Sequence, residues 1–112
     1  MDKLTHYRSL IKQLLTDRAN LMRSQPLPGE EVLCLLEENT DNYLLLRVGW
    51  LRGERLYSPT LHIRIIDHKI QIEQDWTDDF VADLIAAGIP RTDIVFAFTP
   101  PELRSLPDYA VA

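Results

Sequence analysis

The spacing of the apolar residues changes once along the chain, at Pro26–Gly29, and this change points to an α+β fold. Before it, apolar side chains recur at intervals of three, four and seven residues, which is the repeat of one helical face. After it, apolar and polar residues alternate from Glu31 to Asp75, which is typical of strands with one buried face. The spacing predicts a helix over residues 3–23, followed by a sheet. The helical stripe consists of Leu4, Tyr7, Ile11, Leu14, Leu15, Leu21 and Met22.

Three clusters of turn-forming residues divide the alternating segment into four predicted strands. These clusters are Asn39–Asn42, Arg52–Glu54 and Asp67–His68. Because such short connections join antiparallel neighbours, we expect an antiparallel meander. Pro59 lies early in the third strand, where a missing backbone donor indicates a bulge or an edge position.

The last third of the chain predicts a second helix and a short strand. Thr77-Asp78-Asp79 has the composition of a helix start, and Gly88 with Pro90 ends the helix. Residues 94–98 then form the predicted strand, and residues 100–104 one helical turn. The fold class is therefore α+β: a long N-terminal helix packed on an antiparallel four-stranded meander, then a second helix and a short C-terminal strand. We expect one domain over residues 1–112.

The second predicted strand is apolar on both faces. Four large side chains share one face, and three others lie opposite them. Because a single helix covers one side of a sheet, we expect an uncovered apolar surface and self-association as a homo-oligomer, most simply a dimer. The first face carries Leu44, Leu46, Val48 and Trp50, and the second carries Tyr43, Leu45 and Leu51.

The charge distribution bears on nucleic-acid binding. The 112-residue chain has a net charge of −5, although its first 25 residues hold five basic and two acidic side chains. Arg8, Lys12 and Arg23 lie beside the apolar stripe, so direct DNA binding through the first helix is one hypothesis. A solvated helix flank is the other interpretation, and it is favoured because three cations neutralise only about three phosphates.

His62 is the main candidate for chemistry. It lies in an alternating strand, opposite the apolar face, where it could act as a general base oriented by Asp67 or Asp75. A small hydrolase or ligand-binding enzyme centred on His62 is therefore an alternative function. The chain offers no serine or cysteine in a recognisable nucleophile context, since Cys34 lies among apolar residues that would raise its pKa. A surface or interface histidine is the favoured interpretation.

A carboxylate cluster could hold a metal ion, but its spacing is not that of a calcium loop. We interpret two of its members as charges at a helix start, and expect no metal or cofactor. With one cysteine, no apolar run of membrane-spanning length and no signal-like start, we expect a cytoplasmic protein. The cluster consists of Glu73, Asp75, Asp78 and Asp79.

Three stretches of the chain carry motifs of a known family: Met1–Leu4 with Tyr7-Arg8 and Ile11; Tyr43–Trp50 with Arg55, Leu61-His62 and Lys69-Ile70; and Ala87–Pro90 with Asp93–Val95, Pro100–Glu102 and Asp108–Ala112. They resemble the XisI-like family, the fdxN-element excision controlling factors of cyanobacteria. Together they cover essentially the whole sequence. Two positions differ from the family's usual residues: Gln71 stands where tryptophan is usual, and Ser58-Pro59 where His-Gly is usual.

The resemblance implies an accessory factor in the excision of a DNA element. Such a factor acts with a site-specific recombinase and a partner protein, XisH, and has no established active site. The resemblance therefore implies an XisH-like partner and recombinase machinery for this chain, and no catalytic, cofactor-binding or metal-binding residues. The residues we expect to take part in an interaction, or in one of the alternative sites, are Arg8, Lys12, Arg23, Trp50, Arg55 and His62.

Overall fold

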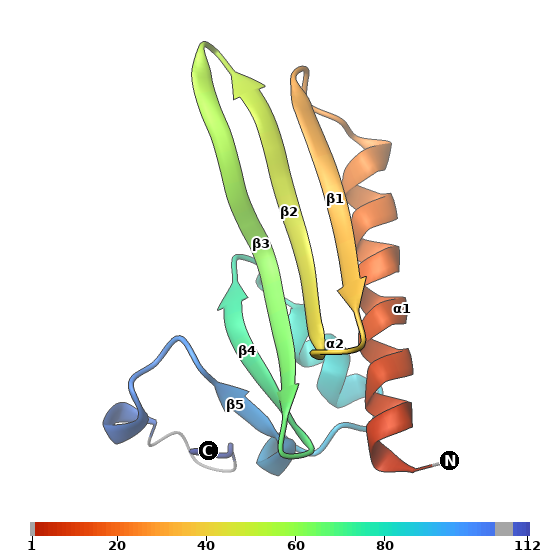
Figure 1. Ribbon diagram of the computed structural model, residues 1–112, viewed down its shortest axis with the longest axis vertical. Helices are drawn as coiled ribbons and strands as arrows, with labels where there is room; N and C mark the ends of the chain where they lie inside the picture. Colours follow the sequence, from red (N-terminus) through yellow and green to blue (C-terminus); the bar gives the residue numbers. More distant parts are fainter. Residues whose placement is uncertain (1, 105–108) are drawn as a thin grey trace.

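The computed structural model describes residues 2–104 and 109–112 (Figure 1). One long helix precedes a five-stranded sheet, whose strands lie in the order β1-β2-β3-β4-β5. The elements are α1 (Lys3–Ser24), β1 (Glu30–Glu37), β2 (Asn42–Leu51), β3 (Glu54–Ile66), β4 (Lys69–Asp75), α2 (Phe80–Ala86), the 3₁₀ turn η1 (Arg91–Asp93), β5 (Ile94–Phe96) and the 3₁₀ turn η2 (Pro101–Leu103).

Helix α1 confirms the predicted first helix and most of its apolar face, but the prediction was wrong for Leu21, which is 63% exposed near the end of the helix, where no strand covers it. The carboxylate of Asp2 caps it by accepting a hydrogen bond from the Thr5 backbone N–H at 2.7 Å. The helix ends at Ser24, just before Pro26, which cannot continue it. Its stripe is buried against the sheet at Tyr7, Ile11, Leu15 and Ala19.

Strands β1 to β4 form the predicted antiparallel meander. Asp41, Arg52 and Asp67, one in each of the three predicted turns, have positive φ angles. The predicted irregularity at Pro59 is a bulge: Pro59 pairs with Leu46 while Leu61 pairs with Leu45, which leaves Thr60 as the extra residue of β3. The bulge shifts the alternation of β3 by one residue, so that odd-numbered side chains point to one face of the sheet before it and to the other face after it.

The C-terminal third gives the predicted second helix and a shorter final strand. Thr77 Oγ1 accepts a hydrogen bond of 3.2 Å from the Phe80 N–H, and Gly88, with a φ of +100°, follows the end of α2. β5 ends at Phe96 rather than at the predicted Phe98. It runs parallel to β4, because α2 crosses over between the two strands, so the sheet is mixed rather than wholly antiparallel.

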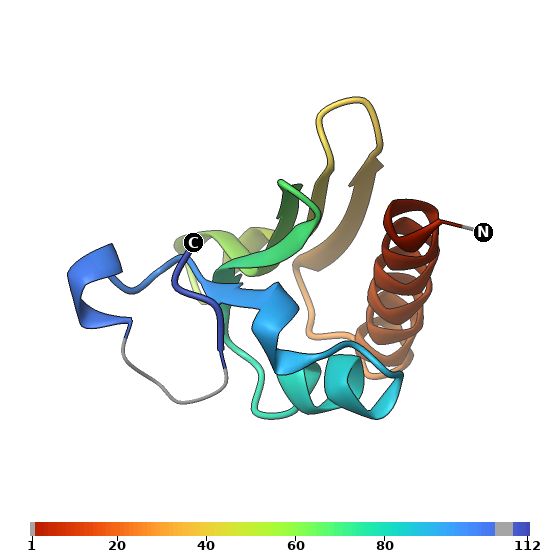
Figure 2. The same cartoon turned by 90° about the horizontal axis from the view of Figure 1, so that it is seen from below.

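Both helices lie on one face of the sheet, and the opposite face carries no helix among the described residues (Figure 2). The buried side of β2 is the one with Tyr43 and Leu45, which pair across the sheet with Ile63 and Leu61. The face with Leu44, Val48 and Trp50 is therefore the uncovered one. No helix in the described part of the chain has both the length and the apolar character needed to cross a lipid bilayer.

Candidate interaction surface

The sheet face turned away from the helices, here called the outer face, is the main exposed apolar surface of the strands. Leu35 on β1, Trp50 on β2 and Tyr57 on β3 expose 45%, 60% and 65% of their surface. Exposed apolar patches of this kind mark interaction sites. By strand alternation and register, the outer face carries Glu31, Leu33 and Leu35 of β1, Leu44, Leu46, Val48 and Trp50 of β2, and Arg55, Tyr57, Pro59 and His62 of β3.

One end of the outer face is an aromatic patch, made of Trp50, Arg55 and Tyr57. The guanidinium carbon of Arg55 lies 5.8 Å from the ring centroid of Trp50 and 6.0 Å from that of Tyr57. Its Nη1 also donates a hydrogen bond of 3.1 Å to the Gly49 carbonyl. Stacking on two rings holds the cation against the sheet, so the patch presents a fixed positive charge between two apolar surfaces.

The other end is a shallow hollow around His62, here called the His62 hollow. The ring Nε2 of His62 lies 2.9 Å from Oδ1 of Asn42 and donates to it. Burial lowers the pKa of His62, so the ring is neutral near pH 7. Burial also raises the pKa of the half-buried Cys34 thiol, which keeps it protonated and unreactive. The hollow is lined by Cys34, Leu35, Leu36, Glu37, Asn42, Leu44 and His62.

The carboxylates suggested as partners of His62 form no hydrogen bond with it. Asp75 Oδ1 instead accepts from the backbone N–H and the hydroxyl of Thr77, at 2.7 and 2.6 Å. Asp67 lies in the β3–β4 turn with a φ of +52°. The histidine–aspartate pair on which the enzyme hypothesis depended is therefore not assembled in the described residues.

The three basic residues proposed as a DNA-binding flank each have a partner within the chain. Arg8 donates to both carboxylate oxygens of Asp41, at 2.7 and 2.9 Å. Lys12 pairs with Glu38. Arg23 donates two hydrogen bonds, of 2.8 and 3.3 Å, to the carbonyl of Val32. Their charges are thus directed at the β1–β2 hairpin rather than aligned as a stripe toward solvent.

The acidic cluster is likewise dispersed among structural contacts. Glu73 lies 3.7 Å from Arg64 across the sheet, and Asp79 lies 2.8 Å from Arg18 on α1. Within residues 2–104 and 109–112, no three histidine, cysteine or acidic side chains are grouped as metal ligands. Asp79 and Asp83 instead join α2 to Arg18, which holds the two helices together.

Two tyrosine–carboxylate networks, one buried and one half-buried, join α1 to later parts of the chain; the second does so through Arg8, which donates to Asp41. Tyr7 Oη donates to Asp93, whose Oδ2 lies 2.7 Å from Lys3 Nζ, and Tyr43 Oη donates to Asp41 at 2.7 Å. Apolar periodicity finds the two tyrosine rings but does not show which carboxylates accept from their hydroxyls.

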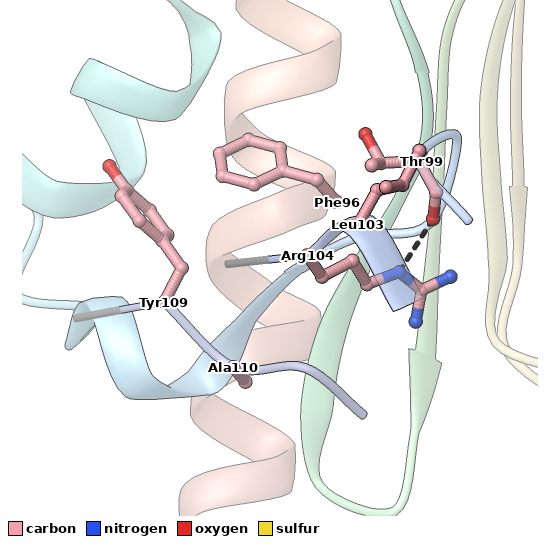
Figure 3. A pocket seen from close by; sticks show the side chains of 6 residues that line it. All are labelled: Phe96, Thr99, Leu103, Arg104, Tyr109 and Ala110. Atoms are coloured by element: carbon pink, nitrogen blue, oxygen red, sulfur yellow. Dashed lines mark hydrogen bonds between the residues drawn. The ribbon is translucent and has the colours of Figure 1, made fainter. Parts of the chain in front are cut away.

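A small cavity lies beside the C-terminal segment (Figure 3). The rings of Phe96 and Tyr109 pack beside it at a tilt of 54°, with centroids 4.8 Å apart, and Arg104 Nε donates to the Thr99 carbonyl at 2.7 Å. Arg104 Nη1 also donates to the Val111 carbonyl at 2.9 Å. These contacts use the charge of Arg104 to hold the last residues against β5, so we interpret the cavity as structural.

The fold and the outer face define a small α+β domain with an exposed sheet surface and a covered one. The chain belongs to the XisI protein family, whose model matches residues 1–111. It is similar to a XisI-like protein from Anabaena variabilis, with 35% identity, a TM-score of 0.89, and coverage of 97% of this chain and 99% of that one.

A second crystal structure, the fdxN element excision controlling factor XisI from Anabaena variabilis, is 37% identical with a TM-score of 0.86. The similarity covers 99% of this chain and 100% of that one. No curated protein matches the chain. The similarity to both structures confirms the resemblance inferred from the sequence and applies to the whole fold.

Proposed function

We propose that this protein is an accessory factor in the excision of a DNA element, that it acts by binding protein partners, and that it carries out no chemistry itself. The observation that carries the proposal is its 37% identity, over 99% of the chain, with an excision controlling factor. The proposed partners are an XisH-like protein and the site-specific recombinase machinery.

The contacts of the ionisable residues support a role in binding. His62 is neutral and bonded to an amide, and Arg8 and Arg23 of α1 are bonded to the β1–β2 hairpin. General acid–base catalysis needs a titrating group held by an orienting partner beside a reacting atom. A net charge of −5 also disfavours binding to duplex DNA without help from a partner.

The His62 hollow is the surface that we assign to the XisH-like partner. Its floor is apolar, and Leu35 on the edge strand remains 45% exposed. Asn42 and Glu37 supply polar groups at its rim. An apolar centre with a polar rim is the usual anatomy of a protein–protein contact.

A binding and excision assay tests this proposal. The purified chain is titrated with the XisH-like protein from the same cells, and excision is measured in cells that express each variant. Leu35→Glu places a charge in the hollow, and we expect it to abolish partner binding and excision together. Leu21→Glu makes the same change at a 63% exposed position of α1 and is expected to retain both.

Two outcomes would contradict the proposal. Equal partner binding by Leu35→Glu and Leu21→Glu would exclude the His62 hollow as the contact. Turnover of a substrate by the purified chain alone, lost in His62→Ala while the fold is retained, would replace the accessory role by the enzyme hypothesis.

A further inference from the structure

Two exposed charges of opposite sign flank the apolar centre of the outer face. Glu31 on β1 pairs with Val48 on β2, which pairs in turn with Tyr57 on β3, so the three form one row across the sheet. Arg55 lies two residues from Tyr57 along β3. Neither Glu31 nor Arg55 forms an ion pair within the described residues.

We propose that this end of the outer face binds a second copy of the chain, in a two-fold dimer whose sheets pack face to face. In aligned sheet packing, the strand directions stay within about 30° of each other and the sheets lie about 10 Å apart. A two-fold axis between the sheets and parallel to β2 places β2 over β2 of the second copy. It places β1 over β3 of the second copy at the same height along the strands.

This symmetry brings the two unpaired charges together. Glu31 then lies over Tyr57 of the second copy, and the Arg55 beside that tyrosine is about 7 Å further along the strand. A glutamate and an arginine side chain span this distance, and the two-fold axis forms the pair twice. A surface that is complementary to itself in this way is what an isologous interface requires.

The apolar groups match in the same arrangement. Val48 lies near the axis and meets its own equivalent, while Trp50 and Tyr57 close over it from both sides. Large aromatic side chains and arginine dominate the energetics of interface centres. Trp50 and Tyr57 are 60% and 65% exposed in the single chain. The dimer therefore removes the two largest apolar side chains of the aromatic patch from water.

A nucleic acid fits this patch less well, because Glu31 and the net charge of −5 repel phosphate. The dimer surface and the His62 hollow lie on the same outer face, so a second copy and an XisH-like partner would compete for it. The inference concerns the purified chain alone, and its failure would leave the binding of an XisH-like partner untouched.

A charge-swap experiment tests the dimer. The mass of the full chain is measured by light scattering and sedimentation over a range of concentrations, and folding is checked by circular dichroism. Wild type is expected at twice 13.0 kDa. Glu31→Arg or Arg55→Glu alone should raise the dissociation constant roughly ten-fold or more, because each places like charges opposite one another. The double variant restores the pair with its sign reversed and should recover the dimer.

Matched controls make the same charge changes in the adjoining turn, outside the outer face. Glu54→Arg and Arg52→Glu alter exposed residues at the β2–β3 turn and should leave the dimer intact. A wild-type monomer at all concentrations would overturn the inference, as would a dimer unaffected by both single variants. If wild type is a monomer and Arg55→Glu instead abolishes binding to the XisH-like protein, the patch belongs to that partner and not to a second copy.

Discussion

The phenol of Tyr7, in the second turn of α1, donates a hydrogen bond to the carboxylate of Asp93, 86 residues further along the chain. Lys3, one turn earlier on the same helix, lies 2.7 Å from the same carboxylate. Asp93 is 8% exposed and directly precedes β5. The first helix therefore fixes the position at which the last strand enters the sheet.

Removing the Tyr7 hydroxyl should destabilise the fold. In Tyr7→Phe, the ring still fills its place in the core, but Asp93 loses a donor while it remains buried. We expect a loss of about 1–3 kcal/mol in the free energy of unfolding, measured by urea denaturation. Tyr57→Phe is the matched control, because Tyr57 is 65% exposed, and its change should be within about 0.5 kcal/mol. Equal effects of the two substitutions would contradict this role of Asp93.

Stability should fall in alkaline solution because two tyrosines are buried beside carboxylates. Burial, reinforced by Asp93, raises the pKa of Tyr7, and burial, reinforced by Asp41, raises the pKa of Tyr43. The folded chain then holds these protons more tightly than the unfolded chain. Their contribution is complete below the ordinary phenol pKa of about 10 and is lost as the pH rises above it.

The pH dependence of urea unfolding measures this effect. Wild type should lose stability with increasing pH above about 10, and Tyr7→Phe should show a shallower decline because one of the two groups is gone. Parallel declines in wild type and variant would show that Tyr7 does not contribute to the alkaline transition.

Gly49 should tolerate no side chain. Its φ is +140°, and a Cβ atom there would lie 1.8 Å from the backbone oxygen of Gly29, which accepts a hydrogen bond from the Trp50 N–H. Gly53 also has a positive φ, of +81°, but a Cβ would meet nothing within 4 Å. Gly53→Ala should therefore cost about 1–2 kcal/mol from backbone strain alone, and Gly49→Ala roughly 1–3 kcal/mol more. Thermal unfolding of both variants tests the difference, and equal melting temperatures would contradict it.

The purified chain should not bind duplex DNA tightly by itself. Arg8, Lys12 and Arg23 each hold a partner on the β1–β2 hairpin, so they contribute few free charges. Fluorescence anisotropy with a labelled duplex at physiological salt should give no submicromolar binding. Submicromolar binding that is lost when these three residues are changed to alanine would restore the DNA-binding hypothesis.

The parts of the fold that depend on neighbouring residues were predictable from the sequence. The apolar stripe predicted the buried face of α1 except at Leu21, and alternation between clusters of turn-forming residues predicted the meander. The parallel pairing of β5 was not, because a strand of three residues has no periodicity and its direction depends on the path of α2. The direction of such a short strand is determined by its pairing with a neighbouring strand, and the local sequence contains no signal for that pairing.

The candidate surface was predictable only in part for the same reason. Trp50 and Leu44 could be placed on one face by alternation, but which face α1 covers depends on tertiary packing. The basic residues of α1 could be recognised as a flank, whereas their engagement by Asp41, Glu38 and Val32 could not. The cation between Trp50 and Tyr57 appears only when the β2–β3 register is known.

The contact between Arg23 and Val32 has a consequence for how copies of the chain meet. The Trp50 N–H donates to the Gly29 carbonyl, so Gly29 and Trp50 form a hydrogen-bonded pair of the antiparallel ladder. Such pairs alternate with pairs that are not hydrogen-bonded, and Val32 with Arg47 is one of the latter. The carbonyl of Val32 therefore points away from β2, at the outermost edge of the sheet. An unprotected edge of this kind recruits strands from other molecules and leads to aggregation. Arg23 on α1 already donates to that carbonyl, so a strand added at this edge must first break the bond between Arg23 and Val32. This opposes the first step by which the sheet could grow into a fibre.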